Sequence, residues 1–338
     1  MLSSDMNEDK AVLVTGGAGF IGAHVAARLL KNGYRVTIFD DLSGGFEENI
    51  PKGAEFIKGS VTDKHLVDDL FCNHNFQYVF HLAAYAAEGL SHFIRNFNYN
   101  NNVIGSINII NSCIRQEVKC LVFTSSIAVY GPAQTPMSES TIPQPEDPYG
   151  IAKYTIEMDL AAANKMFGLN YVIFRPHNVY GELQNIGDRY RNVIGIFINQ
   201  IMNEQPMTIF GDGLQTRAFS HIDDVAPVIA DSIINPDAYG EIFNVGADKP
   251  YTVLEVAGEV ARAFQVEPKI KHLEARKEVV DAFSTHKKVR DFFGHKSTVD
   301  LSRGISGMVN WAKQLEQPRQ GEKFGSLELQ KNLPPAWK

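Results

Sequence analysis

The amino-acid sequence predicts an α/β protein built on a doubly wound parallel sheet, with a smaller α/β lobe toward the C-terminus. Short apolar segments rich in β-branched residues recur through the first half of the chain, and helical patterns separate most of them. A glycine-rich turn joins the first such segment to the first helix. Strands that alternate with helices in this way form a parallel sheet that is covered by helices on both faces.

The pattern of apolar residues places the individual elements. Strands are expected over 11–15, 35–39, 55–58, 77–81, 119–124 and 170–175. Helices are expected over 20–31, 63–73, 91–115 and 148–167. After residue 176 turn residues dominate, and the expected elements are helices over 193–204, 221–234 and 252–264 and a strand over 241–245. We predict a domain over 1–176, to which 221–245 return, and a substrate-binding lobe over 177–338.

Composition excludes several classes of partner. The net charge is −7 and there is no dense run of Lys or Arg, so nucleic acid is not an expected ligand. No apolar run reaches the roughly 18 residues of a membrane span, so no membrane partner is expected. Cys72, Cys113 and Cys120 lack metal-ligand spacing, and so few cysteines indicate a reducing compartment. The N-terminus does not resemble a signal peptide. We expect a cytoplasmic protein without a metal site.

The glycine-rich turn predicts a dinucleotide site. The strand VLVT runs into Gly16-Gly17-Ala18-Gly19-Phe20-Ile21-Gly22. Glycines at 16, 19 and 22 permit a tight turn and a close backbone approach to a pyrophosphate, which the following helix N-terminus then faces. The alternative is a plain tight turn between strand and helix. The strand before and the helix after the turn favour cofactor binding, with contacts from Gly16, Gly19, Phe20, Ile21 and Gly22.

Two carboxylates end the second predicted strand. Asp40 and Asp41 lie about twenty residues beyond the turn, where an acidic side chain accepts hydrogen bonds from the adenosine ribose. A carboxylate there repels a 2′-phosphate, and no arginine follows to receive one. The sequence therefore predicts NAD rather than NADP, with Asp40 the better candidate; a solvated loop aspartate is the alternative.

A tyrosine and a lysine are spaced for proton transfer. Tyr149 and Lys153 stand four apart at the start of a predicted helix, which places them on one face. A neighbouring ammonium and a positive nicotinamide both favour the phenolate, so we expect the pKa of Tyr149 to fall toward working pH. Ser126, at the end of a predicted strand, supplies a hydroxyl to hold a substrate oxygen; Ser125 is the alternative.

With these motifs the chain resembles the extended short-chain dehydrogenases, and within them the nucleotide-sugar epimerases and dehydratases. The matching segments are TGGAGFIG, DDLSGG, HLAA (81–84), TSSIAVYG, YGIAK, RPHNVYG (175–181) and RAFSHIDDVA (217–226). The resemblance implies a Rossmann-like fold in which Tyr149 is the acid/base, Lys153 lowers its pKa and binds the nicotinamide ribose, and Ser126 binds the sugar.

The resemblance also implies further cofactor contacts. The family's contact at the strand end maps to Leu82, Ala83 and Ala84. Its active-site helix asparagine maps to Asn102, for which helix-surface polarity is the alternative. Where the family has an acidic residue after Gly59, this chain has Ser60, so the adenine contact passes to Ser60 and Val61.

For the substrate, the resemblance implies an anchored diphosphate. Arg217 and Arg276 match its arginine contacts, and Asn178 a polar contact; His177 either lines the pocket or fills the core. Thr208 and Phe210 would lie beside the base, with a place in the core as the alternative for Phe210. The remaining expected contacts are Arg191, Asn192 and Val193. Arg189 or Arg191 would pair with a uronate carboxylate, unless both are surface or dimer charges.

The reaction is predicted from what the chain lacks. A 4,6-dehydratase of this group needs acidic residues where Ile127 and Ala128 stand, and neither of these side chains can transfer a proton. Tyr149 is then the expected sole proton carrier. This favours a 4-epimerase of a UDP-sugar, either UDP-glucose/UDP-galactose or UDP-glucuronate/UDP-galacturonate. The alternatives are a nucleotide-sugar dehydrogenase or 4-ketoreductase that releases its cofactor and a non-catalytic NAD-binding scaffold. By resemblance, helices 91–115 and 148–167 would pair in a homodimer.

Overall fold

Seven parallel strands form the central sheet in the computed structural model, which describes residues 10–275, 279–295, 297–315 and 327–337. Their spatial order is β11-β6-β5-β4-β1-β2-β3. The strands are β1 (Ala11–Thr15), β2 (Arg35–Asp40), β3 (Glu55–Lys58), β4 (Tyr78–His81), β5 (Cys120–Thr124), β6 (Tyr171–Pro176) and β11 (Ile242–Val245). The predicted doubly wound parallel sheet is confirmed.

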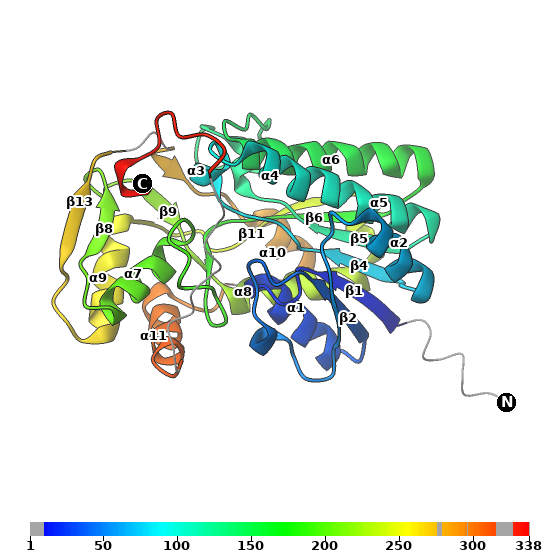
Figure 1. Ribbon diagram of the computed structural model, residues 1–338, viewed down its shortest axis with the longest axis horizontal. Helices are drawn as coiled ribbons and strands as arrows, with labels where there is room; N and C mark the ends of the chain where they lie inside the picture. Colours follow the sequence, from blue (N-terminus) through cyan, green and yellow to red (C-terminus); the bar gives the residue numbers. More distant parts are fainter. Residues whose placement is uncertain (1–9, 276–278, 296, 316–326, 338) are drawn as a thin grey trace.

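Helices cover both faces of the sheet (Figure 1). Successive side chains of a strand point to opposite faces, so Val12 and Val14 join one core and Leu13 joins the other. The first core lies under α1 (Phe20–Lys31) and α8 (Ile222–Asp231). The second lies under α2 (Lys64–Asn73), α5 (Gly105–Arg115) and α6 (Pro148–Phe167). Helix α8 packs on the central sheet and β11 is its edge strand, so the chain returns to the sheet after it has entered the lobe.

The segment predicted as one helix over 91–115 is more broken than expected. The structure has α3 (Glu88–Ser91), then α4 (Arg95–Tyr99), a π-helical turn (Asn100–Ile104) and α5. The wide turn directs Asn102 inward, where its amide donates to Asn98 Oδ1 at 2.9 Å. The asparagine-rich run is thus partly buried rather than a uniformly solvated helix surface.

The lobe has a core of its own. Its helices are α7 (Val193–Met202), α9 (Val253–Phe264) and α11 (Leu301–Ala312), which meet at buried Phe197, Val256 and Ile305. Short strands flank them: β8 (Met207–Phe210) with β13 (Ile270–Leu273), and β9 (Thr216–Ala218) between β12 (Pro250–Thr252) and β14 (Asp281–Ala282). The link to the sheet is made by β7 (Val179–Tyr180), β10 (Ser220–His221) and α10 (Lys287–Phe293).

The topology creates a binding position between the two parts. The chain runs from β1 outward to β2 and β3, then crosses to β4 on the other side of β1 and continues outward to β5 and β6, so the carboxyl ends of β1 and β4 flank a crevice. The C-terminal segment 327–337 crosses near α3 and α4 at the top of the view (Figure 1). No helix in the described parts of the chain is both long and apolar enough to span a bilayer.

Candidate active site

A single cleft of about 1980 Å³ runs between the sheet's carboxyl edge and the lobe. Ligand pockets for one small molecule are typically about 300–1,000 Å³, so this cleft has room for a dinucleotide and a second ligand. Nearly all the predicted site residues in the described chain line it; Ser60 and Asn102 do not. Arg276 lies outside the described residues. Among the described residues no group of three or more His, Cys, Asp and Glu is arranged to hold a metal ion.

The glycine turn forms a cradle that larger residues would fill. Gly16 has φ +71°, and a Cβ on it would lie 2.7 Å from the Ala83 backbone at the end of β4. A Cβ on Gly22 would lie 2.1 Å from the Gly16 carbonyl oxygen. The turn therefore leaves its backbone open toward the cleft, where α1 begins at Phe20. Backbone N–H groups and a helix N-terminus at this position fit the pyrophosphate of a dinucleotide.

Asp40 both lines this cradle and stabilises its backbone by hydrogen bonds. Its carboxylate accepts hydrogen bonds from Ala18 N at 3.0 Å and from Leu42 N at 2.8 Å. Burial raises the pKa of Asp40, against the lowering effect of these hydrogen bonds. Asp41 lines the cleft next to it and accepts from Ser43 N at 2.9 Å. Carboxylate oxygens here fit the ribose hydroxyls of NAD.

The part of the cleft expected to hold the cofactor is also lined by Val61, Leu82, Ala83 and Ala84. The two predicted cofactor residues off the cleft have other partners. Asn102 Oδ1 accepts from Tyr85 N at 2.9 Å, and its amide donates to the Tyr85 carbonyl at 3.2 Å, so Asn102 braces the loop after β4. The Ser60 hydroxyl pairs with Thr62 Oγ1 at 2.9 Å. The predicted direct contacts of these two residues are therefore not brought into the cleft.

The start of α6 carries the candidate proton carrier. Asp147 caps this helix by accepting from Gly150 N at 2.9 Å, with Pro148 as the first helical residue. The next residue, Tyr149, faces the cleft with only 6% of its surface exposed, and its N–H donates to Ser91 Oγ at 3.2 Å. One turn on, Lys153 Nζ donates to the Thr124 carbonyl at 2.7 Å and lies 5.9 Å from the Tyr149 ring centre.

Burial sets the protonation of this pair. It lowers the pKa of Lys153 to about 7, although Glu157 opposes the shift. It raises the pKa of Tyr149, and the negative charge of Glu88 raises it further, while a hydrogen bond with Ser126 lowers it. The protein alone therefore does not provide the expected low tyrosine pKa. Of the two positive groups expected to lower the pKa of Tyr149, Lys153 is itself shifted toward its neutral form. The lowering is therefore expected mainly from the positive charge of a bound nicotinamide.

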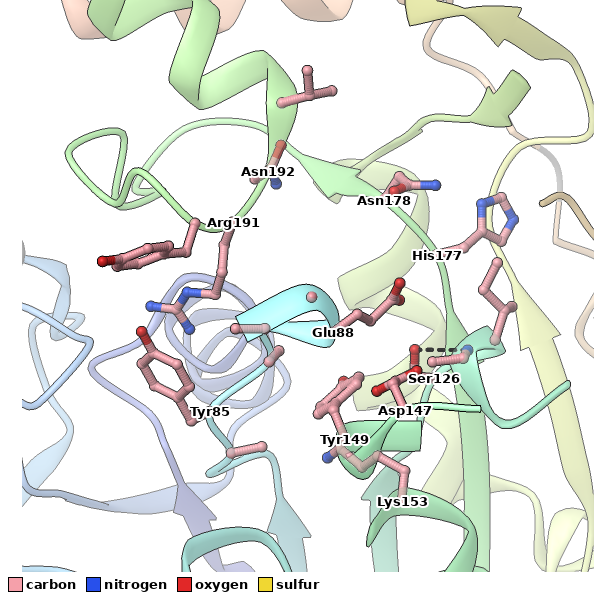
Figure 2. A pocket seen from close by; sticks show the side chains of 18 of the residues that line it. Tyr85, Glu88, Ser126, Asp147, Tyr149, Lys153, His177, Asn178, Arg191 and Asn192 are labelled. Atoms are coloured by element: carbon pink, nitrogen blue, oxygen red, sulfur yellow. Dashed lines mark hydrogen bonds between the residues drawn. The ribbon is translucent and has the colours of Figure 1, made fainter. Parts of the chain in front are cut away.

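The structure distinguishes the two candidate serines. Ser126 lines the cleft and accepts from Ala128 N at 3.1 Å (Figure 2). Its hydroxyl also interacts with Tyr149 and lowers the pKa of that tyrosine. The Ser125 hydroxyl instead donates to Glu157 Oε1 at 2.5 Å. Glu157 also receives two hydrogen bonds from the buried Arg175 guanidinium, from Nε at 2.9 Å and from Nη2 at 2.5 Å. The Ser125 hydroxyl is thus bound to the buried Glu157–Arg175 pair, and the geometry favours Ser126 for substrate binding.

The predicted substrate residues belong to the lobe side of the cleft. His177 is buried between the Ala218 carbonyl, 3.0 Å from its Nδ1, and His286 Nε2, 2.9 Å from its Nε2. Asn178 donates to the same Ala218 carbonyl at 3.1 Å. Asn192 donates to the Val179 carbonyl at 2.7 Å, and Val193 follows it as the first residue of α7. Hydrogen bonds of this kind fix the wall that faces Tyr149.

The two arginines considered for a substrate carboxylate are held by protein groups. Arg191 Nε donates to Asp188 Oδ2 at 2.7 Å, and its guanidinium lies 4.6 Å from the centre of the Tyr85 ring (Figure 2). Arg189 Nη2 donates to the Trp337 carbonyl at 3.0 Å. Arg191 still lines the cleft. It also lies close to the loop after β2, since a Cβ on Gly44 would be 3.5 Å from Arg191 Nη2.

The far end of the cleft carries the residues expected beside a nucleotide. Thr208 and Phe210 line it from β8, and Thr208 N donates to Gln200 Oε1 at 3.0 Å. Arg217 lines it from β9 and donates to the Val280 carbonyl at 2.8 Å and the Val279 carbonyl at 2.5 Å. These bonds hold Arg217 in place at the cleft wall.

Three parts of the cleft wall were not predicted from the sequence: Glu88, Asp147 and the C-terminal residues. Glu88 and Asp147 line the cleft near Tyr149, so Tyr149 is not the only group there able to carry a proton. Residues 329 and 331–337 line it as well, although they are remote in sequence from every motif. The Asp147-Pro148 pair was readable as a helix start. Glu88 and the C-terminal residues follow no local pattern, and only the packing brings them in.

Comparisons with known proteins agree with this geometry. The NAD dependent epimerase/dehydratase family matches residues 12–246. A putative UDP-glucose 4-epimerase of Methanocaldococcus jannaschii is 35% identical over 89% of this chain and 98% of its own length. Two solved structures share the fold with a TM-score of 0.85 over 90% of this chain and 99% of theirs. They are the Thermotoga maritima UDP-glucose 4-epimerase with UDP-glucose, 33% identical, and the Thermus thermophilus enzyme in complex with NAD, 30% identical. The chain belongs to the NAD dependent epimerase/dehydratase family.

Proposed function

We propose that this protein is an isomerase, an NAD-dependent UDP-sugar 4-epimerase. The observation that carries the proposal is the convergence of Tyr149, Lys153 and Ser126 in one cleft, between a dinucleotide cradle and a lobe suited to a nucleotide. Both ligands then meet at the start of α6. The relatives named as UDP-glucose 4-epimerases support the same conclusion.

The chain's own residues divide the chemistry. Ser126 Oγ positions the sugar's 4-hydroxyl, and Tyr149 Oη removes its proton and later returns it. The glycine turn and Asp40 would hold NAD, which when bound would supply reversible hydride transfer at C4. Lys153 lies beneath the tyrosine ring as a cation that stabilises the phenolate when charged. The 4-keto sugar turns over in between, so that the hydroxyl is rebuilt with the opposite configuration while Arg217 keeps the diphosphate in place.

A substrate panel tests the proposal. The purified protein is incubated with UDP-, GDP- and dTDP-sugars without added NAD, and the C4 configuration is read by NMR. We expect inversion of a UDP-sugar and no net NADH. Net NADH formation together with an oxidised product would instead indicate a dehydrogenase. Tyr149→Phe should lose about 10³-fold in kcat, since general acid–base catalysis contributes about 10²–10⁴-fold. Tyr154→Phe, on the same helix, is the matched control and should retain activity.

We also propose that the enzyme acts as a homodimer in the cytoplasm. Large apolar side chains are exposed along α6 and just before α5: Ile104, Ile151, Met158, Met166 and Phe167. Such a surface suits pairing of these helices across a two-fold axis. The cysteines are free, and two of them, Cys113 and Cys120, are buried, which suits a reducing compartment. Light scattering of the wild type and of Met158→Asp would test the dimer.

A further inference from the structure

Two buried histidines meet behind the wall that faces Tyr149. His177 directly follows β6 and lines the cleft beside Asn178 (Figure 2), and His286 lies behind it, directly before α10. The two histidines are only 2% and 1% exposed, and their Nε2 atoms lie 2.9 Å apart. The proton transfer proposed for Tyr149 uses neither of them.

The hydrogen-bond partners of this pair fix its number of protons. His177 Nδ1 lies 3.0 Å from the Ala218 carbonyl, and His286 Nδ1 lies 2.7 Å from Asp248 Oδ1. A carbonyl and a carboxylate only accept hydrogen bonds, so each Nδ1 must carry a proton. The contact between the two Nε2 atoms needs one more proton, since two lone pairs at this distance repel each other. Three protons on four ring nitrogens give the pair one positive charge.

The surroundings place this charge on His286. Burial lowers the pKa of His177 to about 3, and the charge of His286 lowers it further. A hydrogen bond from His286, together with the charges of His286 and Arg290, lowers the pKa of Asp248 to about 2, so a carboxylate faces His286. Arg290, which donates to the other oxygen of Asp248, and His295 are the positive or titratable groups that oppose the charge. The proton between the rings therefore belongs to His286, which donates it to His177.

The chain is closely packed around the two rings. Gly246 directly follows β11 with φ +154°, and a Cβ on it would lie 2.7 Å from His177 Nε2 and 2.3 Å from Ser220 Oγ. On the other side, the Ser284 hydroxyl lies 3.1 Å from His286 Nε2 and can donate or accept there. Glycine at this position lets the backbone close over the rings. The buried pair thus depends on its protein partners for its hydrogen bonds.

The cleft wall depends on the pair through one carbonyl. The Ala218 carbonyl accepts from His177 Nδ1 at 3.0 Å and from Asn178 Nδ2 at 3.1 Å. Ala218 follows Arg217 on β9, so this carbonyl joins the end of β6 to the strand that carries Arg217. If His286 kept only its Nδ1 proton, it would present a lone pair to the lone pair of His177. The contact that holds His177 would then become repulsive, and the wall would loosen.

We propose that His286 is a positioning residue for the wall that binds the UDP-sugar: as an imidazolium it holds His177, and through the Ala218 carbonyl it fixes Asn178 and β9. This role rests on the proposed function, whereas the charge of the pair does not. The proton involved is distinct from the one that Tyr149 moves. Its contribution to binding is present while His286 is charged, and it is lost as rising pH removes the proton.

Nitrogen-15 NMR of the NAD-loaded holoprotein reads the charge of the pair. Long-range proton–nitrogen spectra distinguish protonated from unprotonated ring nitrogens. At a pH where the exposed His65 has become neutral, we expect His286 to be protonated on both nitrogens and His177 on Nδ1 only. Asp248→Asn removes the counter-charge, so its pair should lose the proton at lower pH than the wild type. Two neutral rings in the wild type, or the same titration in both proteins, would overturn the inference.

Calorimetry with UDP, the part common to the candidate substrates, tests the positioning role. Asp248 does not line the cleft, and its side chain is 54% exposed, so its variants should fold. At neutral pH we expect Asp248→Asn to bind UDP about tenfold more weakly than the wild type. Asp248→Glu keeps the carboxylate and should bind UDP as the wild type does. Removal of a carboxylate by itself favours an anionic ligand, so weaker binding would not come from net charge.

The matched control is Asp291→Asn. Asp291 lies on α10 and is bonded to Lys287, so its removal should not weaken UDP binding. At low pH, where both pairs are charged, Asp248→Asn and the wild type should bind UDP alike. A loss that persists at low pH, or equal losses in Asp248→Asn and Asp291→Asn, would overturn the positioning role. The expected NMR and binding results without epimerisation of any UDP-sugar would sink only the proposed function.

Discussion

The two ends of the cleft are built in different ways. At the cofactor end, the wall is mostly backbone: the glycine turn, the end of β4 and a helix N-terminus, all close to one another along the sheet's carboxyl edge. At the sugar end, the wall consists of side chains from distant segments. Arg191 and Trp337 are examples: Arg191 lies over the Tyr85 ring and Trp337 packs on Phe93.

This difference separates a general requirement from a particular one. A pyrophosphate needs N–H groups and close approach, which any glycine turn between strand and helix can offer. A sugar is distinguished by the placement of individual charges and hydrogen bonds, which depends on packing far along the chain. Changes at the cofactor end should therefore weaken NAD binding and so impair the reaction with every substrate. Changes at the sugar end should alter the preference for one sugar over another.

The largest effect is expected at the cofactor end, from Gly22→Ala. The new Cβ would lie 2.1 Å from the Gly16 carbonyl oxygen, which is backbone and cannot yield without moving the turn. We expect NAD affinity to fall at least about 10³-fold, or roughly 4 kcal/mol. Titration of the apoprotein with NAD, followed by fluorescence or calorimetry, measures this.

A second glycine provides the control for Gly22. Gly258 lies inside α9, and a Cβ there meets no atom within 4 Å. Gly258→Ala should leave NAD binding intact and stabilise the fold by up to about 1 kcal/mol, because alanine is the better helix former. If Gly22→Ala bound NAD as tightly as Gly258→Ala, the cradle would not be the pyrophosphate site.

The next effect concerns the floor that both ends share. Glu157 and Arg175 form a buried ion pair, with side chains 3% and 2% exposed. Glu157→Gln leaves the guanidinium buried without a counter-ion, so we expect a loss of about 3 kcal/mol in the free energy of unfolding. Urea unfolding would measure it. Glu259→Gln breaks the more exposed pair with Arg262 and should cost less than about 1 kcal/mol. Similar losses for the two variants would contradict the role of burial.

The same contrast explains what the sequence revealed. The alternating strands and helices, the glycine turn and the Tyr149–Lys153 spacing are local patterns, and the fold class they predicted is confirmed. The single helix expected over 91–115 was wrong in detail, because periodicity does not record a π-helical turn. Asn102 has the residue type of a contact residue, yet tertiary packing uses its amide to brace Tyr85.

The sugar end was least visible in the sequence for a physical reason. Glu88 is one acidic residue on a four-residue helix, and the direction of that helix depends on packing against the distant Leu333 and Trp337 and on a hydrogen bond to α6. Arg191 looked available for a carboxylate, but Asp188 and Tyr85 occupy it in the fold. Long-range packing of this kind leaves no spacing or period to detect in one chain.

Trp337→Ala should test whether the C-terminal segment supports the sugar end alone. Trp337 is 6% exposed and packs edge-to-face on Phe93 and Tyr190. Its loss should loosen α3 and raise the KM for the UDP-sugar by about tenfold, or 1.4 kcal/mol, while NAD affinity stays unchanged. Ile234→Ala, an exposed apolar residue outside the cleft, is the control. A parallel fall in NAD affinity would show that the two ends are not separable in this way.

The smallest expected effect is a shift in pH dependence from Glu88→Gln. Burial and the negative charge of Glu88 raise the pKa of Tyr149, which must lose its proton to act as the base. Removing that charge lowers the tyrosine pKa, so the rising limb of kcat/KM against pH should move to lower pH. Glu274→Gln removes one charge from the same cleft near the nucleotide, away from Tyr149, and should leave the limb in place. A limb that stays unmoved in Glu88→Gln would mean that Glu88 does not act on the proton carrier, and a move to higher pH would reverse the sign argued from its charge.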